Sequence, residues 1–175
     1  MDIALLVLRI VVGLGFAAHG AQKLFGWFGG HGIDGTAGFF DQIGLRPARA
    51  HAYAAGVTEF AGGLLIAVGL GVPFAAAALI AVMTAAILTV HLRNGFFNTE
   101  NGYEYNLELA AAVFALAGVG AGEWALDAAF GLDLAGTAWA LGALGVGVLG
   151  GVAAVLSGRL LSAPRSEQRE SAQAA

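Results

Sequence analysis

The residues best suited to chemistry are a histidine, an amide and an amine that lie close together in one apolar stretch. Gln22 and Lys23 follow His19 by three and four residues, so in a helix their side chains project from the same face as His19. A run of rings and glycines follows, which is typical of a helix end at a membrane boundary. Trp27 and Phe28 of this run are candidates to stack over a flat ligand beside the polar face.

Two carboxylates further along, Glu104 and Glu108, are four residues apart and share a predicted helix face. Like charges at this spacing repel, so keeping both ionised requires a nearby cation, a metal ion or one shared proton. The alternative is a solvated first helical turn, where acidic side chains suit the positive end of the helix dipole. His91 ends another apolar stretch, where a lone histidine is more often a hydrogen-bonded residue than a ligand.

Two charges fall within apolar stretches. Arg9 lies in the first stretch and Glu59 lies halfway along the second. A carboxylate at membrane depth costs several kcal/mol unless it is protonated, paired or hydrated. We therefore predict a buried ion pair between Arg9 and Glu59. The alternative for the arginine is snorkelling to the membrane surface, and the alternative for Glu59 is a functional role in which it closes the polar site from below.

The amino-acid composition indicates whether the protein lies in water or in a membrane, and it excludes several functions. A chain that is 58% hydrophobic and 11% charged cannot cover a water-soluble surface, so we predict a multi-pass membrane protein that contacts the lipid bilayer. The absence of cysteine excludes disulfides, thiol redox chemistry and cysteine-ligated iron–sulfur clusters within this sequence. There is no basic patch for nucleic acid, and we expect no metal site.

The fold class predicted is all-α, a polytopic bundle of membrane-spanning helices. The segments long enough to cross the bilayer are about residues 3–25, 47–70, 74–92, 106–122 and 135–156. Gly147 and Gly151 of the last segment suit tight helix packing.

The bundle divides into a main part and a C-terminal addition. Residues 1–133 form the main bundle, residues 134–161 hold an additional transmembrane helix, and the polar tail 162–175 is expected to be disordered. The glycine-rich connector 26–46 is predicted to be an interfacial or re-entrant piece, with a plain amphipathic connector as the alternative.

Lysine and arginine lie in loops on one side of this bundle, which predicts a cytoplasmic side in the inner (plasma) membrane. The N-terminus is then outside and the C-terminus cytoplasmic. The residues that give this bias are Lys23, Arg46, Arg49, Arg93, Arg159, Arg165 and Arg169. The same topology gathers the polar helix ends into one candidate site at the cytoplasmic face. Its predicted members are His19, Gln22, Lys23, His91, Glu104 and Glu108.

Four ordered motifs resemble the DoxX family of small bacterial membrane proteins over roughly residues 4–127. They are the His19–Gly30 segment with Gly35-Thr-Ala, then Glu59-Phe-Ala-Gly-Gly, His91-Leu-Arg-Asn-Gly-Phe-Phe and Gly102-Tyr-Glu-Tyr-Asn. The resemblance implies a four-helix membrane bundle, to which this chain adds a fifth helix. It also implies association, as in some members, with quinone-linked thiosulfate oxidation or with a membrane oxidoreductase assembly for redox defence.

Three functions follow from these patterns. The first is a redox component whose polar cluster binds a quinone headgroup or relays protons. The second is a non-catalytic anchor for a soluble or membrane oxidoreductase subunit. A small transporter is weaker, because no pair of broken helices is evident. Haem between His19 and His91 is disfavoured, because it would require the two histidines to match in depth.

Overall fold

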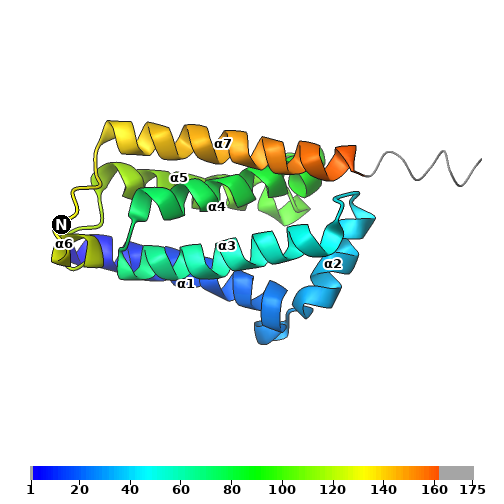
Figure 1. Ribbon diagram of the computed structural model, residues 1–175, viewed down its shortest axis with the longest axis horizontal. Helices are drawn as coiled ribbons and strands as arrows, with labels where there is room; N and C mark the ends of the chain where they lie inside the picture. The colour runs from blue at the N-terminus through cyan, green and yellow to red at the C-terminus, as the bar shows by residue number, and fades with distance from the viewer. Residues whose placement is uncertain (1, 162–175) are drawn as a thin grey trace, which may run out of the picture.

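The computed structural model describes residues 2–161, and its long helices run nearly side by side (Figure 1). The long helices are α1 (Asp2–Phe25), α3 (Ala48–Val68), α4 (Val72–Ala86), α5 (Glu104–Val119) and α7 (Thr137–Leu160). Short helices connect them: η1 (Trp27–Gly29), α2 (Gly32–Gln42), η2 (Ile87–His91), η3 (Leu92–Asn94), η4 (Asn98–Glu100) and α6 (Leu126–Ala129). The described chain contains no strand, which confirms the all-α prediction; the predicted disordered tail lies outside the described residues.

Four of the five predicted spans are long and apolar enough to cross a membrane. They are Asp2–Phe25, Ala48–Val68, Val72–Asn94 and Thr137–Leu160. The remaining helix, α5, is shorter than predicted, since it has 16 residues. At 1.5 Å per residue it measures about 24 Å, less than the roughly 30 Å of a hydrocarbon core. The difference lies at its C-terminal end, where Gly120 stops the helix three residues before the predicted end.

The helices form two packed units. α1 packs along α3, and α4 packs along α7 and α5. Glycines allow the close approach: a Cβ on Gly13 of α1 would lie 2.5 Å from the carbonyl oxygen of Gly63 in α3. Gly147 and Gly151 of α7 lie against Ile80 and Thr84 of α4 in the same way, so the predicted tight packing of this helix is confirmed.

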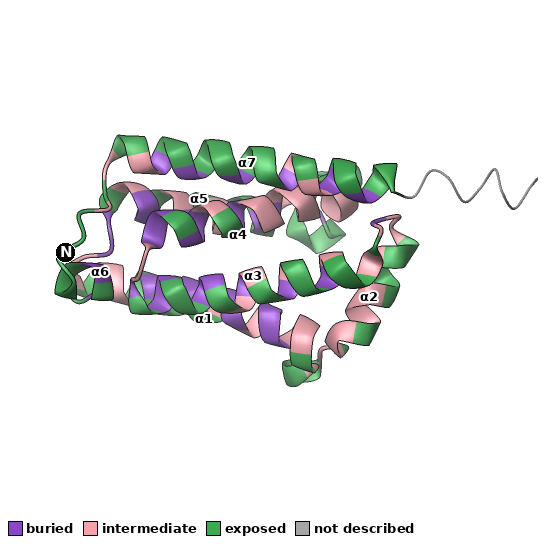
Figure 2. Cartoon of the chain, in the orientation of Figure 1, coloured by how far each residue is buried: buried purple, intermediate pink, exposed green. Residues whose placement is uncertain are grey.

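The distribution of buried and exposed side chains is the one expected for a protein surrounded by lipid. The buried side chains face the interior of the bundle, whereas the outward faces of the long helices are exposed (Figure 2). Many of the exposed side chains are large and apolar, such as Val11 at 66% and Leu149 at 72% exposure. In water such a surface would associate, so it indicates contact with lipid.

The bundle has two different ends (Figure 1). The N-terminus, the α3–α4 turn and α6 lie at one end, which we call the N-terminal end. The other end, called the α2 end, holds α2, the last turn of α1, the start of α3 and the C-terminal end of α7. The predicted cytoplasmic basic residues from Lys23 to Arg159 belong to helix ends and loops on this α2 side.

The 26–46 connector folds as α2, which crosses the α2 end and packs against α3 and α1 (Figure 1). Gly26, with φ of 73°, ends α1 in the left-handed conformation that favours glycine. The Thr36 hydroxyl then lies 2.8 Å from the Gly32 carbonyl and 3.2 Å from the Lys23 carbonyl. This contact holds α2 against the last turn of α1.

The predicted ion pair between Arg9 and Glu59 is wrong. Arg9 is 1% exposed and its Nη2 donates to the Trp124 carbonyl at 2.6 Å, at the N-terminal end. Its guanidinium also occupies the position where a side chain on Gly69 would lie. Gly69 is ten residues after Glu59, which is about 15 Å along the helix. The prediction placed the two helix ends at one level, but α1 and α3 pair with a stagger that separates these residues.

Asp127 of the α5–α7 connector holds this connector against the start of α4 at the N-terminal end. Asp127 is buried and its carboxylate accepts the backbone N–H groups of Gly71 at 2.8 Å and Val72 at 3.3 Å. N–H groups at the start of a helix have no partner within the helix, so Asp127 caps α4. Arg9 therefore belongs to the N-terminal end of the bundle, away from Glu59.

Candidate functional site

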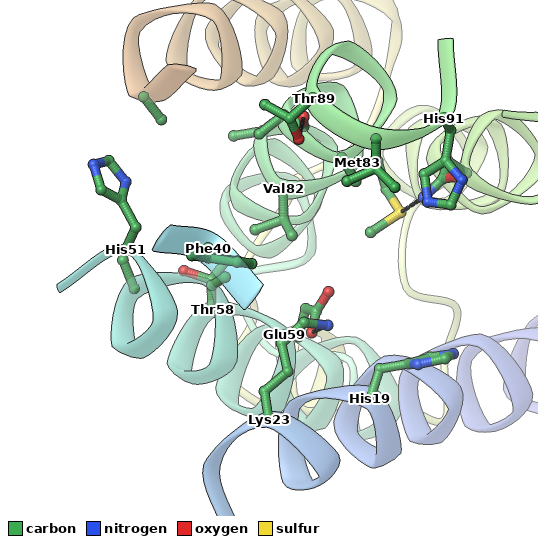
Figure 3. A pocket seen from close by; sticks show the side chains of 18 of the residues that line it. His19, Lys23, Phe40, His51, Thr58, Glu59, Val82, Met83, Thr89 and His91 are labelled. Carbon is green, nitrogen blue, oxygen red and sulfur yellow. Dashed lines mark hydrogen bonds and ion pairs between the residues drawn. The ribbon is translucent and has the colours of Figure 1, made fainter. Parts of the chain in front are cut away.

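A pocket of about 620 Å³ lies between the two helix units toward the α2 end (Figure 3). Small and apolar side chains of α3, α4, α5 and α7 make most of its wall, among them Ala54, Ala81, Leu109, Ala154 and Val155. Its polar lining consists of His19, Lys23, His51, Thr58, Glu59, Thr89, His91, Asn98, Tyr105 and Asn106. This size and lining are typical of sites for small organic ligands.

An ion pair between Lys23 and Glu59 forms one side of the pocket (Figure 3). Glu59 is 3% exposed, whereas Lys23 keeps 26% of its side chain exposed. The stagger of α1 against α3 explains the partner, because helical side chains point back toward the N-terminus and carry the Lys23 amine toward Glu59. Glu59 thus has the cation that a buried carboxylate requires, supplied from the predicted polar face of α1.

His19 and His91, two of the predicted site residues, both line the pocket. The His19 ring is 6.2 Å from the Tyr105 ring, centroid to centroid. His91 Nδ1 donates to the Asn101 carbonyl at 2.8 Å, which leaves Nε2 as the acceptor of a neutral ring. His91 ends η2, a π-helical turn that continues α4, and such turns are frequent at functional sites.

Three predicted site residues lie outside the pocket lining. The Gln22 side chain donates to the Phe28 carbonyl at 3.2 Å and so holds the turn after α1. The Glu104 carboxylate accepts the backbone N–H of Asn98 at 2.9 Å, and Glu108 is exposed. Lys23 does not supply the cation that would relieve the repulsion between Glu104 and Glu108, because it pairs with Glu59.

The aromatic cover comes from a different segment than predicted. Trp27 and Phe28 are 55% and 72% exposed and do not line the pocket. Phe39 and Phe40 of α2 line it instead, and Phe40 lies beside Thr58 in Figure 3. The 26–46 connector therefore supplies rings to the pocket, but from α2 rather than from the turn before it.

Sequence reasoning missed the polar groups on α3 and α4. His51 and Thr58 are seven residues apart, close to two helical turns, and Glu59 follows directly. This spacing puts His51 and Thr58 on one face of α3, so helical periodicity around Glu59 was the available signal. Thr89 lies within η2, two residues before His91, and could not be found in this way.

The arrangement combines an apolar chamber with hydrogen-bonding groups and a buried ion pair. Such a site suits a flat apolar ring that carries hydrogen-bond acceptors. Within residues 2–161 no group of three or more histidine and carboxylate side chains is arranged to hold a metal ion.

Comparisons with known proteins give a family and one relative. The family model of DoxX matches residues 4–92. The chain is 32% identical over 117 residues to a protein of Bacillus subtilis (strain 168) named "Putative oxidoreductase CatD", which covers 67% of this chain and 81% of that protein. No solved structure matches the chain.

Proposed function

The chain belongs to the DoxX family, and on that premise we propose that it is a membrane subunit of a redox system which binds a quinone headgroup in the pocket. The name of its Bacillus relative, an oxidoreductase, supports the reaction class. The observation that carries the ligand class is the apolar pocket with an amine, a carboxylate and imidazoles along its wall.

The pocket offers both an apolar wall for a quinone ring and polar groups for its carbonyl oxygens. Alanines and valines of α3, α4 and α7 exclude water from a ring, and Phe40 offers a face for stacking. Lys23 has three N–H donors, of which Glu59 accepts one, so the others remain available to a carbonyl oxygen. His19 provides a second polar group on the same side.

Quinone reduction takes up protons, and the pocket places groups that can hold them. An imidazole can donate or accept a proton, and both His19 and His91 line the pocket near the α2 end. Electrons would come from a partner, since this sequence has no cysteine for a thiol or iron–sulfur centre. The chain would therefore act as one subunit of an oxidoreductase system.

Binding of a soluble quinone to the purified protein tests this function. We expect short-chain ubiquinone to bind in a calorimetric titration, and His19→Ala to weaken it by about tenfold, the effect of one hydrogen bond. Glu108→Gln is the matched control, because Glu108 is exposed and outside the pocket lining.

The opposite result has a clear meaning. If the folded wild type binds no quinone, the redox-ligand function fails and a non-catalytic anchor for a partner enzyme is favoured. Equal affinity in wild type and folded His19→Ala would place the ligand elsewhere.

A further inference from the structure

A second polar group lies on the side of the pocket opposite the ion pair. His51 stands between α3 and α7, apart from Lys23 and Glu59, and Thr58 lies between them (Figure 3). Gly158 of α7 leaves room for the imidazole, because a Cβ there would lie 3.2 Å from His51 Nε2. The pocket is therefore polar at two separated places with an apolar chamber between them.

The hydrogen-bonding capacity of this second group is unused. Thr89 is not available as a donor, because its hydroxyl donates to the Ala85 carbonyl at 2.7 Å. The structure gives the side chains of His51 and Thr58 no hydrogen-bond partner among residues 2–161. A neutral imidazole always has one N–H to donate. His51 therefore presents a free donor to a ligand at the α7 side.

The spacing of the two polar places fits a particular ligand. His51 and Glu59 are eight residues apart on α3, so their backbone positions are about 12 Å apart along the helix axis, and the Lys23 amine is paired with the Glu59 carboxylate. Two hydrogen bonds of about 2.8 Å to opposite carbonyls of one ring span about 11 Å between the donor atoms. A ring with a single carbonyl reaches only one of the two places.

We infer that the pocket selects 1,4-quinones, with one carbonyl bound at the Lys23–Glu59 side and the opposite carbonyl bound by His51. This inference rests on the proposed function and assigns His51 as its specificity residue. The chamber between the two places, walled by Ala54, Ala55 and Phe40, holds the ring itself.

The test compares two bicyclic compounds of similar size, 1,4-naphthoquinone with two opposed carbonyls and α-tetralone with one. We expect the wild type to bind the naphthoquinone about tenfold more tightly, the effect of one hydrogen bond. His51→Phe should remove this preference and leave tetralone affinity unchanged. Since the sequence has no cysteine, quinone addition to thiols does not disturb the titration.

Two variants keep the test decisive. Tyr53→Phe on the same helix is the control, because Tyr53 is 46% exposed and does not line the pocket. His51→Gln keeps an N–H donor and should retain the preference even if His51→Phe fails to fold. If folded His51→Phe still prefers the naphthoquinone, or if it loses affinity for both compounds, the inference is overturned while the proposed function stands. No binding of either compound by the wild type overturns the proposed function as well.

Discussion

The ion pair between Lys23 and Glu59 makes a prediction that separates the two residues' roles. Glu59 is 3% exposed and Lys23 is 26% exposed, so removing the lysine leaves a carboxylate that water cannot reach. Removing the carboxylate instead leaves an amine that can move to solvent on its long side chain. Lys23→Met should therefore destabilise the protein more than Glu59→Met, and the double variant least.

The magnitude follows from the burial of the pair. Breaking a buried pair by removing one partner costs about 3–5 kcal/mol. The lower value applies to Lys23→Met because Lys23 is partly exposed. For a chain of this length 1 kcal/mol shifts the midpoint of thermal unfolding by about 2–4 °C, so a loss of about 3 kcal/mol lowers Tm by about 6–12 °C. The double variant, with two apolar side chains, should lie within about 1 kcal/mol of the wild type.

The assay must suit the sequence. The chain has three tryptophans and no cysteine, so tryptophan fluorescence during heating in detergent reports unfolding where a thiol dye cannot. The Arg49–Asp34 pair at the same end is the control, because its side chains are 60% and 81% exposed. Asp34→Asn should change stability by less than about 1 kcal/mol. Equal Tm values for Lys23→Met, the double variant and the wild type would refute the reasoning.

Three further predictions concern the fold and its orientation. Asp127→Ala should cost about 2–4 kcal/mol in thermal unfolding, because it uncaps α4 and removes the carboxylate near Arg9, whereas Asp133→Ala at an exposed site of the same connector should cost little. Gly13→Ala should destabilise the protein by about 1–3 kcal/mol through contact with α3, while Gly15→Ala, which has nothing within 4 Å of its added Cβ, should leave Tm unchanged. A fluorescent protein fused after Ala175 should be bright and alkaline phosphatase at the same place inactive; the reverse pattern contradicts the cytoplasmic C-terminus.

The sequence predicts the parts of this protein that depend on local pattern. Apolar length and glycine positions give the helices, and the polar face of α1 gives His19 and Lys23 as pocket residues. The partner of Glu59 could not be predicted, because it depends on how far α1 is displaced along α3. Close glycine contacts such as Gly13 against Gly63 set that displacement, and many glycines in both helices permit other registers.

The structure of the loop before α5 could not be predicted from the sequence pattern either. Glu104 and Glu108 have the spacing of a functional pair, yet one carboxylate holds the loop at Asn98 and the other faces outward. The shortening of α5 lies at the other end of that helix, where Gly120, with φ of 92°, stops it before the predicted boundary. Hydrogen bonds between a loop and the helix after it leave little trace in periodicity.

The π-helical turn Ile87–His91 has a consequence for how this site can change in evolution. Its backbone bonds skip one residue more than those of an α-helix, so it accommodates one additional residue within α4. Each residue of an α-helix turns the chain by about 100°, so deleting one residue from the turn would rotate His91 by about that angle. The helix would still cross the membrane, but its histidine would leave the pocket wall. The loss of a single codon here would therefore change the pocket surface while the turns of α4 before Ile87 keep their register.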